Sequence, residues 1–145
     1  MNESAMNLER FLTAQAPVMA DVMAELQAGR KQSHWMWFVF PQLAALGRSA
    51  TAKFYGLRDL AEAKAYLAHP VLGARLVDCT RAVLAHAGKK TAHEIFGAPD
   101  DLKFRSCMTL FMLAAPQLDV FRSALDAFYA GEADENTVWQ VGADR

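Results

Sequence analysis

The segment Lys31–Gln42, with the sequence KQSHWMWFVFPQ, constrains the fold more than any other part of the chain. It contains two of the three tryptophans and two of the nine phenylalanines. Each of these large side chains buries about 150–250 Å² when it packs in a protein interior. The rest of the chain must therefore fold around this segment.

Periodicity does not decide whether this segment is a helix or a strand, because both faces of a strand would be apolar. Pro41 disfavours helical backbone at the residue before it and so ends any helix there. Ser33 is a suitable N-cap. We predict a short buried helix over Ser33–Val39, followed by extended backbone over Phe40–Gln42. The alternative is a strand that pairs with Thr137–Val141 in a hairpin.

The two indoles of this segment distinguish the alternatives. In a helix Trp35 and Trp37 would lie about 200° apart around the axis, because each residue advances by about 100°. One indole would then anchor the core while the other faces a cleft. In a strand both indoles would lie on the same face.

Helical signals recur along the rest of the chain. Apolar residues follow at helical spacing after Pro17 and after Pro70, each of which fits the first turn of a helix. Asp59 and Thr91 are good N-caps for further helices. We therefore predict an all-α fold of about seven to nine helices, several of them short.

A chain of 145 residues has the size of one domain. We predict a single compact domain over residues 1–145, with an ordered core over about residues 7–130. The remainder, residues 131–145, is predicted as an acidic C-terminal tail that follows Gly131. Trp139 in this tail is large and apolar, so we expect it to pack back on the body of the protein.

The composition excludes several classes of function. The formal net charge of −1 and the pI near 6.4 do not fit a nucleic-acid-binding protein, which usually has a basic face. Cys79 and Cys107 lie in separate segments, as reduced thiols of a cytoplasmic protein would. No signal peptide is visible, and the longest uncharged runs are too short for a membrane helix. We expect a cytoplasmic protein without nucleic-acid or membrane partners; the oligomeric state stays open.

Motifs with known chemistry are missing from the sequence. There is no glycine-rich phosphate loop, no HExxH and no nucleophile elbow. The four histidines are dispersed and give no pair at metal-ligand spacing: His34, His69, His86 and His93. We expect neither a metal ion nor a cofactor.

Polar residues beside the aromatic segment are the first candidates for a site. Lys31, His34 and Gln42 lie next to Trp35 and Trp37. A cleft with aromatic walls and a few convergent polar groups is typical of small-molecule sites. The alternative is that His34 is a structural residue beside the core.

Two further segments interrupt apolar runs with polar residues. In the predicted helix from Asp100, Lys103 and Ser106 share a face, and a buried ammonium would need a partner. In HPVLGARL, from His69 to Leu76, the helix start and Arg75 could receive an anion. Helix packing with Arg75 on the surface explains this second segment equally well.

Together these segments resemble an uncharacterised family of bacterial domains of unknown function, some of whose members carry the label calpastatin. The resemblance rests on SHWMWFVFPQ, HPVLGARL, and IFG followed by DDLKFRSCMTLF, and it spans about Leu8–Phe128. It implies a mainly α-helical single domain. Calpastatin itself is disordered, so the label does not fit this globular composition. The family pattern falls on Lys31, Ser33, His34, Trp35, Trp37, Phe40, Pro41, Gln42, Gly47, Gly73, Arg75, Leu76, Lys103 and Ser106, with Cys107 where the family usually has serine.

These residues favour a small-molecule-binding domain for an anionic or nucleotide-like ligand. The ligand-binding residues would be Lys31, His34, Trp35, Trp37, Gln42, Arg75, Lys103 and Ser106. A first alternative is a protein-interaction or scaffold module without a ligand, because the seven methionines suit adaptable surfaces. A second is a glycosidase-type hydrolase with His34 as acid or base. It draws on a faint similarity to glycosidases of ribosylated nucleotide-pathway metabolites. Whether the protein is an enzyme stays open.

Overall fold

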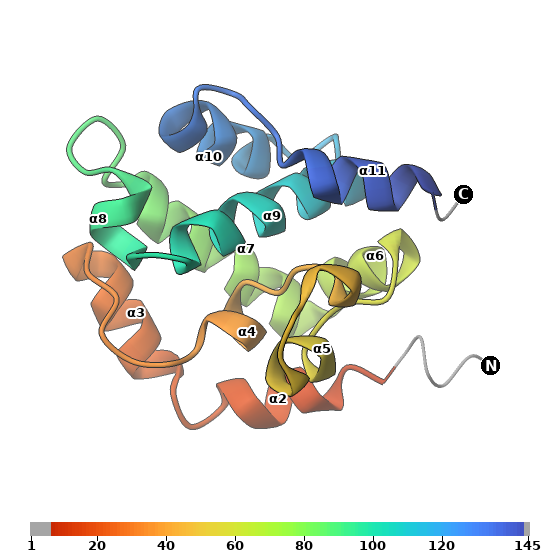
Figure 1. The fold of residues 1–145 in the computed structure, drawn as a ribbon. Coiled ribbons are helices and arrows are strands. Elements are labelled where there is room, and N and C mark those ends of the chain that lie inside the picture. Colours follow the sequence, from red (N-terminus) through yellow and green to blue (C-terminus); the bar gives the residue numbers. More distant parts are fainter. Residues whose placement is uncertain (1–6, 144–145) are drawn as a thin grey trace.

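Helix α9 (Asp100–Ala114) runs through the middle of the structure, and other helices pack around it (Figure 1). Its contacts are with α6 (Leu60–Ala68), α8 (Ala92–Phe96), α10 (Asp119–Tyr129) and α11 (Glu135–Ala143). The reason is its composition, because apolar side chains cover most of its circumference beyond the first turn. A helix that is apolar nearly all round is stable only when it is surrounded.

The computed structural model describes residues 7–143, which form one all-α domain and confirm the predicted fold class. This part of the chain has ten α-helices and no β-strand; three of the helices have only four or five residues. Ten helices exceed the predicted seven to nine. The remaining elements are α2 (Glu9–Gln15), α3 (Met19–Ala28), α4 (Met36–Val39), the 3-10 helix η1 (Ala44–Leu46), α5 (Ala50–Phe54) and α7 (Pro70–Leu84).

Side-chain caps start several of these helices as the sequence predicts. The Asp59 carboxylate accepts a hydrogen bond from the amide of Glu62, and Thr91 forms a capping box with Glu94. Gly29 ends α3 in the left-handed conformation, with φ of 71°. Within residues 7–143, no helix is long and apolar enough to cross a membrane.

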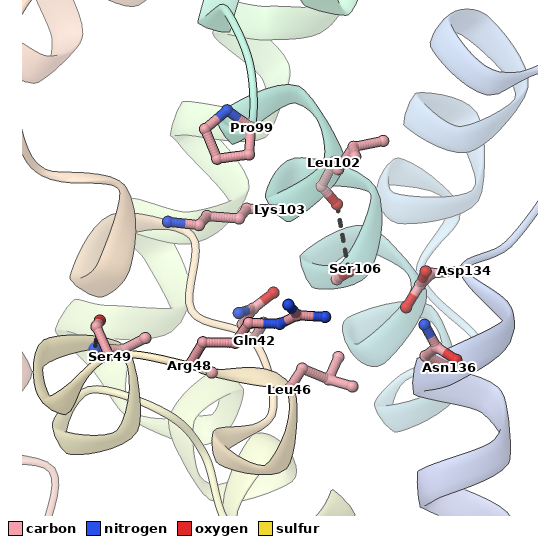
Figure 2. A pocket seen from close by; sticks show the side chains of 12 residues that line it. Gln42, Leu46, Arg48, Ser49, Pro99, Leu102, Lys103, Ser106, Asp134 and Asn136 are labelled. Atoms are coloured by element: carbon pink, nitrogen blue, oxygen red, sulfur yellow. Dashed lines mark hydrogen bonds between the residues drawn. The ribbon is translucent and has the colours of Figure 1, made fainter.

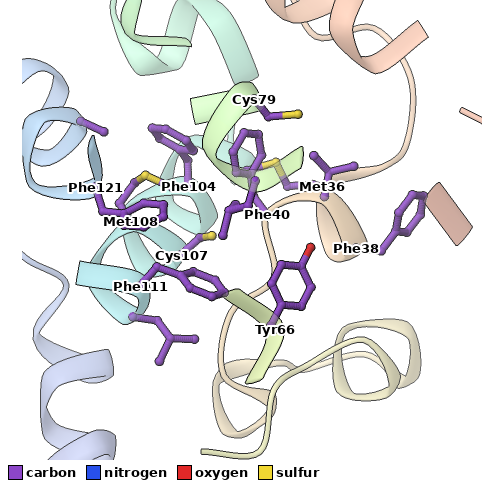
Figure 3. Packing of buried hydrophobic residues seen from close by; sticks show 14 of the residues in the cluster. Met36, Phe38, Phe40, Tyr66, Cys79, Phe104, Cys107, Met108, Phe111 and Phe121 are labelled. Atoms are coloured by element: carbon purple, nitrogen blue, oxygen red, sulfur yellow. The ribbon is translucent and has the colours of Figure 1, made fainter. Parts of the chain in front are cut away.

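The aromatic segment forms the helix α4, so the helical alternative is confirmed and the hairpin is wrong. Trp35 is 1% exposed and Phe40 is equally buried. The ring of Phe40 contacts Phe104 edge-on, with 5.0 Å between the ring centres (Figure 3). It packs in the same way on Phe96, at 5.9 Å. The segment is therefore anchored directly on the central helix.

Helix α4 begins later than predicted, because Ser33 does not cap it. The Ser33 hydroxyl instead donates to the Glu25 carboxylate, at 2.5 Å. The same carboxylate accepts hydrogen bonds from the amides of Gln32 and Ser33, at 2.8 and 3.0 Å, and from the indole nitrogen of Trp35, at 2.9 Å. Glu25 on α3 thus fastens the whole entry to the aromatic segment.

The C-terminal segment corrects the predicted tail, because residues 135–143 form the helix α11. Thr137 and Val141 are buried one turn apart, where they face the body of the protein. Trp139 lies two residues from each, on the opposite face, and is 69% exposed. The expectation that Trp139 packs back on the body is therefore wrong. In a helix, Trp139 lies on the face opposite Thr137 and Val141, and this explains its exposure.

We predict that Glu25→Gln destabilises the protein at neutral pH and has little effect near pH 2. Burial pushes the pKa of Glu25 up, but the hydrogen bonds from Ser33, Gln32 and Trp35 outweigh it and lower the pKa from 4.5 to about 2. A lowered pKa contributes stability that is present above the unfolded-state pKa and is lost as the pH falls through the folded-state pKa. Urea midpoints of both proteins between pH 7 and pH 2 test this. A difference that is constant over the range would contradict it.

Truncating the two indoles is expected to have unequal effects. Trp35→Ala removes a fully buried side chain and should cost about 3–5 kcal/mol through lost burial and a cavity. Trp37 is only half-buried, so Trp37→Ala should cost much less. Urea denaturation of the two variants measures both losses. Two equally large losses would show that both indoles belong to the core.

Candidate functional site

A cavity of about 570 Å³ opens between the corner formed by η1 and α5, the first half of α9, and the start of α11 (Figure 2). Polar and charged groups from all three sides reach it. The side chains that line it come from Gln42, Leu46, Arg48, Ser49, Ala52, Pro99, Leu102, Lys103, Ser106, Asp134 and Asn136, together with Gly47. Three other hollows among the described residues are smaller, with volumes of about 10, 350 and 320 Å³.

Helix α9 supplies Lys103 and Ser106 to the cavity, one turn apart as the sequence predicts. The Ser106 hydroxyl donates to the carbonyl of Leu102, at 3.2 Å, so its hydrogen bond is satisfied within the helix. Ser106 also lines the cavity, and a hydroxyl oxygen that donates its proton can still accept a hydrogen bond. Ser106 therefore offers an acceptor rather than an activated nucleophile.

The aromatic segment delivers Gln42 to the opposite wall. Two backbone hydrogen bonds hold this part of the chain: the amide of Leu57 donates to the Gln42 carbonyl, at 2.9 Å, and the amide of Ala44 donates to the Leu57 carbonyl, at 2.7 Å. Gly56 packs closely on Ala44, because a Cβ added to Gly56 would stand 2.3 Å from the Cα of Ala44. The backbone that carries Gln42 is thus fixed by close packing.

Arg48 and Ser49 stand at the turn between η1 and α5. The Ser49 hydroxyl accepts a hydrogen bond from the amide of Ala52 and so caps α5. Arg48 is exposed and forms no ion pair within residues 7–143. Its guanidinium is therefore available to an incoming group.

An ion cluster beside the cavity ties two of the predicted residues together. The ammonium of Lys31 lies 3.0 Å from the Asp100 carboxylate, and that of Lys103 lies 3.7 Å from its other oxygen. Each ammonium also stands over an indole: Lys31 is 5.1 Å from the ring centre of Trp35, and Lys103 is 5.3 Å from that of Trp37. Asp100 is the partner that the predicted buried lysine required.

The structure thus brings together only some of the predicted site residues. Gln42, Lys103 and Ser106 line the cavity. Trp37 lines a much smaller hollow that shares Gln42 and Lys103 with it. Lys31 lies beside them with only 8% of its side chain exposed, so it stabilises the cluster rather than facing a ligand.

Three other predicted residues lie apart from the cavity. Trp35 belongs to the core. His34 is exposed and pairs with neither Asp100 nor Asp101; the latter lies 3.3 Å from His93 instead. Arg75 donates a hydrogen bond to the side chain of Gln15, at 3.2 Å, on another part of the molecule.

The start of α7 serves packing rather than anion binding. The imidazole of His69 accepts hydrogen bonds from the amides of Val71 and Leu72, at 3.2 and 3.3 Å, and so occupies the donors that an anion would need. A Cβ at Gly73 would stand 2.0 Å from the Leu67 carbonyl oxygen, so this glycine lets α6 and α7 approach closely. The packing explanation of HPVLGARL fits these contacts.

Four polar or charged cavity residues were absent from the sequence-based set: Arg48, Ser49, Asp134 and Asn136. Gly47, which precedes Arg48 and also lines the cavity, was named only as part of the family pattern. Asp134 was assigned to an acidic tail, although aspartate three residues before Thr137 is a recognisable N-cap. The N-cap could therefore have been found from the sequence. The neighbouring residues do not show, however, that the start of this helix faces α9.

The cysteines lie outside this cavity and are unreactive. Burial, together with the negative charge of Asp78, raises the pKa of Cys79 to about 12. Burial also raises the pKa of Cys107 well above its ordinary value. The thiolate is the reactive form of cysteine, so neither residue acts as a nucleophile at neutral pH. Within the described residues, no three His, Cys, Asp or Glu side chains gather as a metal site would require.

The fold and the cavity define an all-α domain with a mixed-charge pocket beside its central helix. A family model described as "Protein of unknown function (DUF1810)" matches residues 5–141, and the chain belongs to this family. The crystal structure of the conserved hypothetical protein Rv1873 from Mycobacterium tuberculosis is similar, with a TM-score of 0.92 and 49% sequence identity, over 94% of this chain and 97% of that chain. A search of curated proteins gives no match. The family resemblance drawn from the motifs is confirmed, and the function of the family is unknown.

We predict that Asp100→Asn destabilises the protein because it leaves the nearly buried Lys31 ammonium without its carboxylate. Breaking a buried ion pair lowers the free energy of unfolding by about 3–5 kcal/mol. Because Asp100 is partly exposed, the loss in Asp100→Asn should lie at or below the lower end of this range. The double variant Lys31→Met with Asp100→Asn should lose less than the sum of the single losses. Urea denaturation measures this cycle, with Asp126→Asn as an exposed control. Additive losses would show that the pair contributes no coupling.

Proposed function

We propose that the protein binds an anionic, nucleotide-sized small molecule in the cavity between the η1–α5 corner, α9 and α11. One observation carries this proposal: two cations from different elements, Arg48 and Lys103, line the same cavity. Among the described residues, the guanidinium has no ion-pair partner, and the ammonium has a single ion pair, the 3.7 Å contact with Asp100.

The size and chemistry of the cavity support this function. Its volume of about 570 Å³ lies within the range of about 300–1,000 Å³ that is typical of small-molecule sites. Arginine can bind a phosphate or carboxylate through two parallel hydrogen bonds, and lysine adds a compact charge. Gln42, Ser49 and Ser106 add neutral groups that orient a ligand. Among the described residues, no aromatic side chain lines this cavity, and Trp37 lines the adjoining smaller hollow instead.

The interaction alternative keeps one supporting observation. Val138 and Trp139 are neighbours on α11 and are 44% and 69% exposed. The hydrolase alternative has less support, because His34 does not line the cavity. We also propose a cytoplasmic location, since both cysteines are free thiols buried in the core.

Binding of pyrophosphate and of adenosine 5′-monophosphate, measured by isothermal titration calorimetry, tests this function. Both anions should bind, and neutral adenosine should bind more weakly than its monophosphate. Arg48→Gln or Lys103→Gln should each reduce the affinity about 10-fold or more, because a hydrogen bond to a charged group contributes about 1.5–3 kcal/mol. Added salt should weaken binding.

Arg122→Gln and Lys64→Gln are matched controls, because both residues are exposed on helices and neither lines the cavity. These variants should bind like the unmodified protein. Absence of binding by both anions at millimolar concentration would overturn the proposal. Equal losses in the cavity variants and the controls would show that binding is nonspecific and would overturn it too.

A further inference from the structure

The side of the cavity formed by the start of α11 carries an acidic group. Figure 2 shows Asp134 and Asn136 at the start of α11, across the cavity from Lys103 and Ser49. One oxygen of the Asp134 carboxylate, Oδ2, accepts hydrogen bonds from the amide and the hydroxyl of Thr137, at 3.0 and 2.6 Å. The other oxygen, Oδ1, accepts no hydrogen bond from the described residues. It is therefore available to a donor in the cavity.

Asp134 is held in place by α9. Its backbone amide donates to the hydroxyl of Thr109, at 2.9 Å. Arg105 donates to the carbonyls of Glu132 and Ala133, at 2.8 and 3.1 Å, and so fastens the preceding residues to the same helix. The position of this carboxylate is thus set by hydrogen bonds that do not depend on a ligand, as is usual for a preorganised binding group.

The opposite charges of the cavity do not neutralise each other. Among the described residues, Asp134 forms no ion pair with Arg48 or Lys103, although all three line the same space. A ligand that carries only an anionic group would use the cations and leave the carboxylate unmatched. A ligand that carries an anion at one end and hydrogen-bond donors at the other would match both sides.

We propose that the ligand is a phosphorylated sugar or a nucleotide. This proposal rests on the proposed function and adds the ligand class. The phosphate contacts Arg48 and Lys103, and vicinal sugar hydroxyls donate to Asp134 Oδ1 and accept from the amide of Asn136. Hydroxyl groups suit this side better than an ammonium, because a hydroxyl both donates and accepts whereas an ammonium only donates.

Adenosine 5′-monophosphate and its 2′,3′-dideoxy analogue test this assignment, because they share base and charge and differ only in the two hydroxyls. In calorimetry, the unmodified protein should bind the complete nucleotide about 10-fold or more tightly than the analogue, as expected when a buried polar group loses its partner. Asp134→Asn should remove this preference. Asparagine is as good an N-cap as aspartate, so the start of α11 is retained.

Asp119→Asn, an exposed carboxylate outside the cavity, is the matched control and should keep the preference. Equal affinities of the unmodified protein for the two nucleotides, with both still weakened by Arg48→Gln, would overturn the ligand class and leave anion binding intact. A preference that persists in Asp134→Asn would overturn the role of Asp134. If neither nucleotide nor pyrophosphate binds, both proposals fail.

Discussion

The packing of Phe40 on Phe104 is the contact on which the rest of the structure depends. It joins the aromatic segment to the central helix α9, and Phe96 closes the same cluster, with its ring stacked on Phe104 at 4.7 Å between centres. Burying three aromatic rings at one point is strongly stabilising, because each removes a large apolar area from water. Two sequence-distant parts of the chain are thereby fixed against each other.

That contact also places the cavity. Pro41 and Gln42 follow Phe40 directly, so the chain that leaves the core must pass beside Lys103, which precedes Phe104 on α9. The buried ring therefore brings an amide and an ammonium to the same cavity. Asp100, one turn earlier, forms an ion pair with each of the two lysines next to the indoles and makes it possible for Lys31 to be nearly buried.

The two walls of the cavity are built differently. The wall with Asp134 is held to α9 by Arg105 and Thr109, whereas Arg48 projects from an exposed turn and lacks an ion-pair partner among the described residues. Asp134 is thus a fixed acceptor, and Arg48 is a cation on a turn. A bound ligand, rather than another protein group, would balance the charges of these two residues. This is the physical basis of both proposals, and neither requires a nucleophile or a metal ion.

The sequence by itself determined the fold class, several helix starts and the family. These depend on local physics: helical spacing of apolar residues, caps such as Asp59 and Thr91, and the stop at Pro41 act within a few residues. The sequence also singled out Gln42, Lys103 and Ser106, which line the cavity, because polar groups in apolar surroundings need partners. It missed α11 because its buried face is carried by only Thr137 and Val141, while the exposed Trp139 obscured the period.

Only the tertiary structure decided which candidates share a site. Lys103, Arg48 and Asp134 lie far apart in sequence and meet because α9 is surrounded by helices from both ends of the chain. The same packing leaves His34 exposed, and it brings Arg75 within hydrogen-bond distance of the Gln15 side chain. Hydrogen bonds and ion pairs are satisfied by whatever long-range packing brings within reach, so a polar residue's partner is a property of the fold and not of its neighbours in sequence.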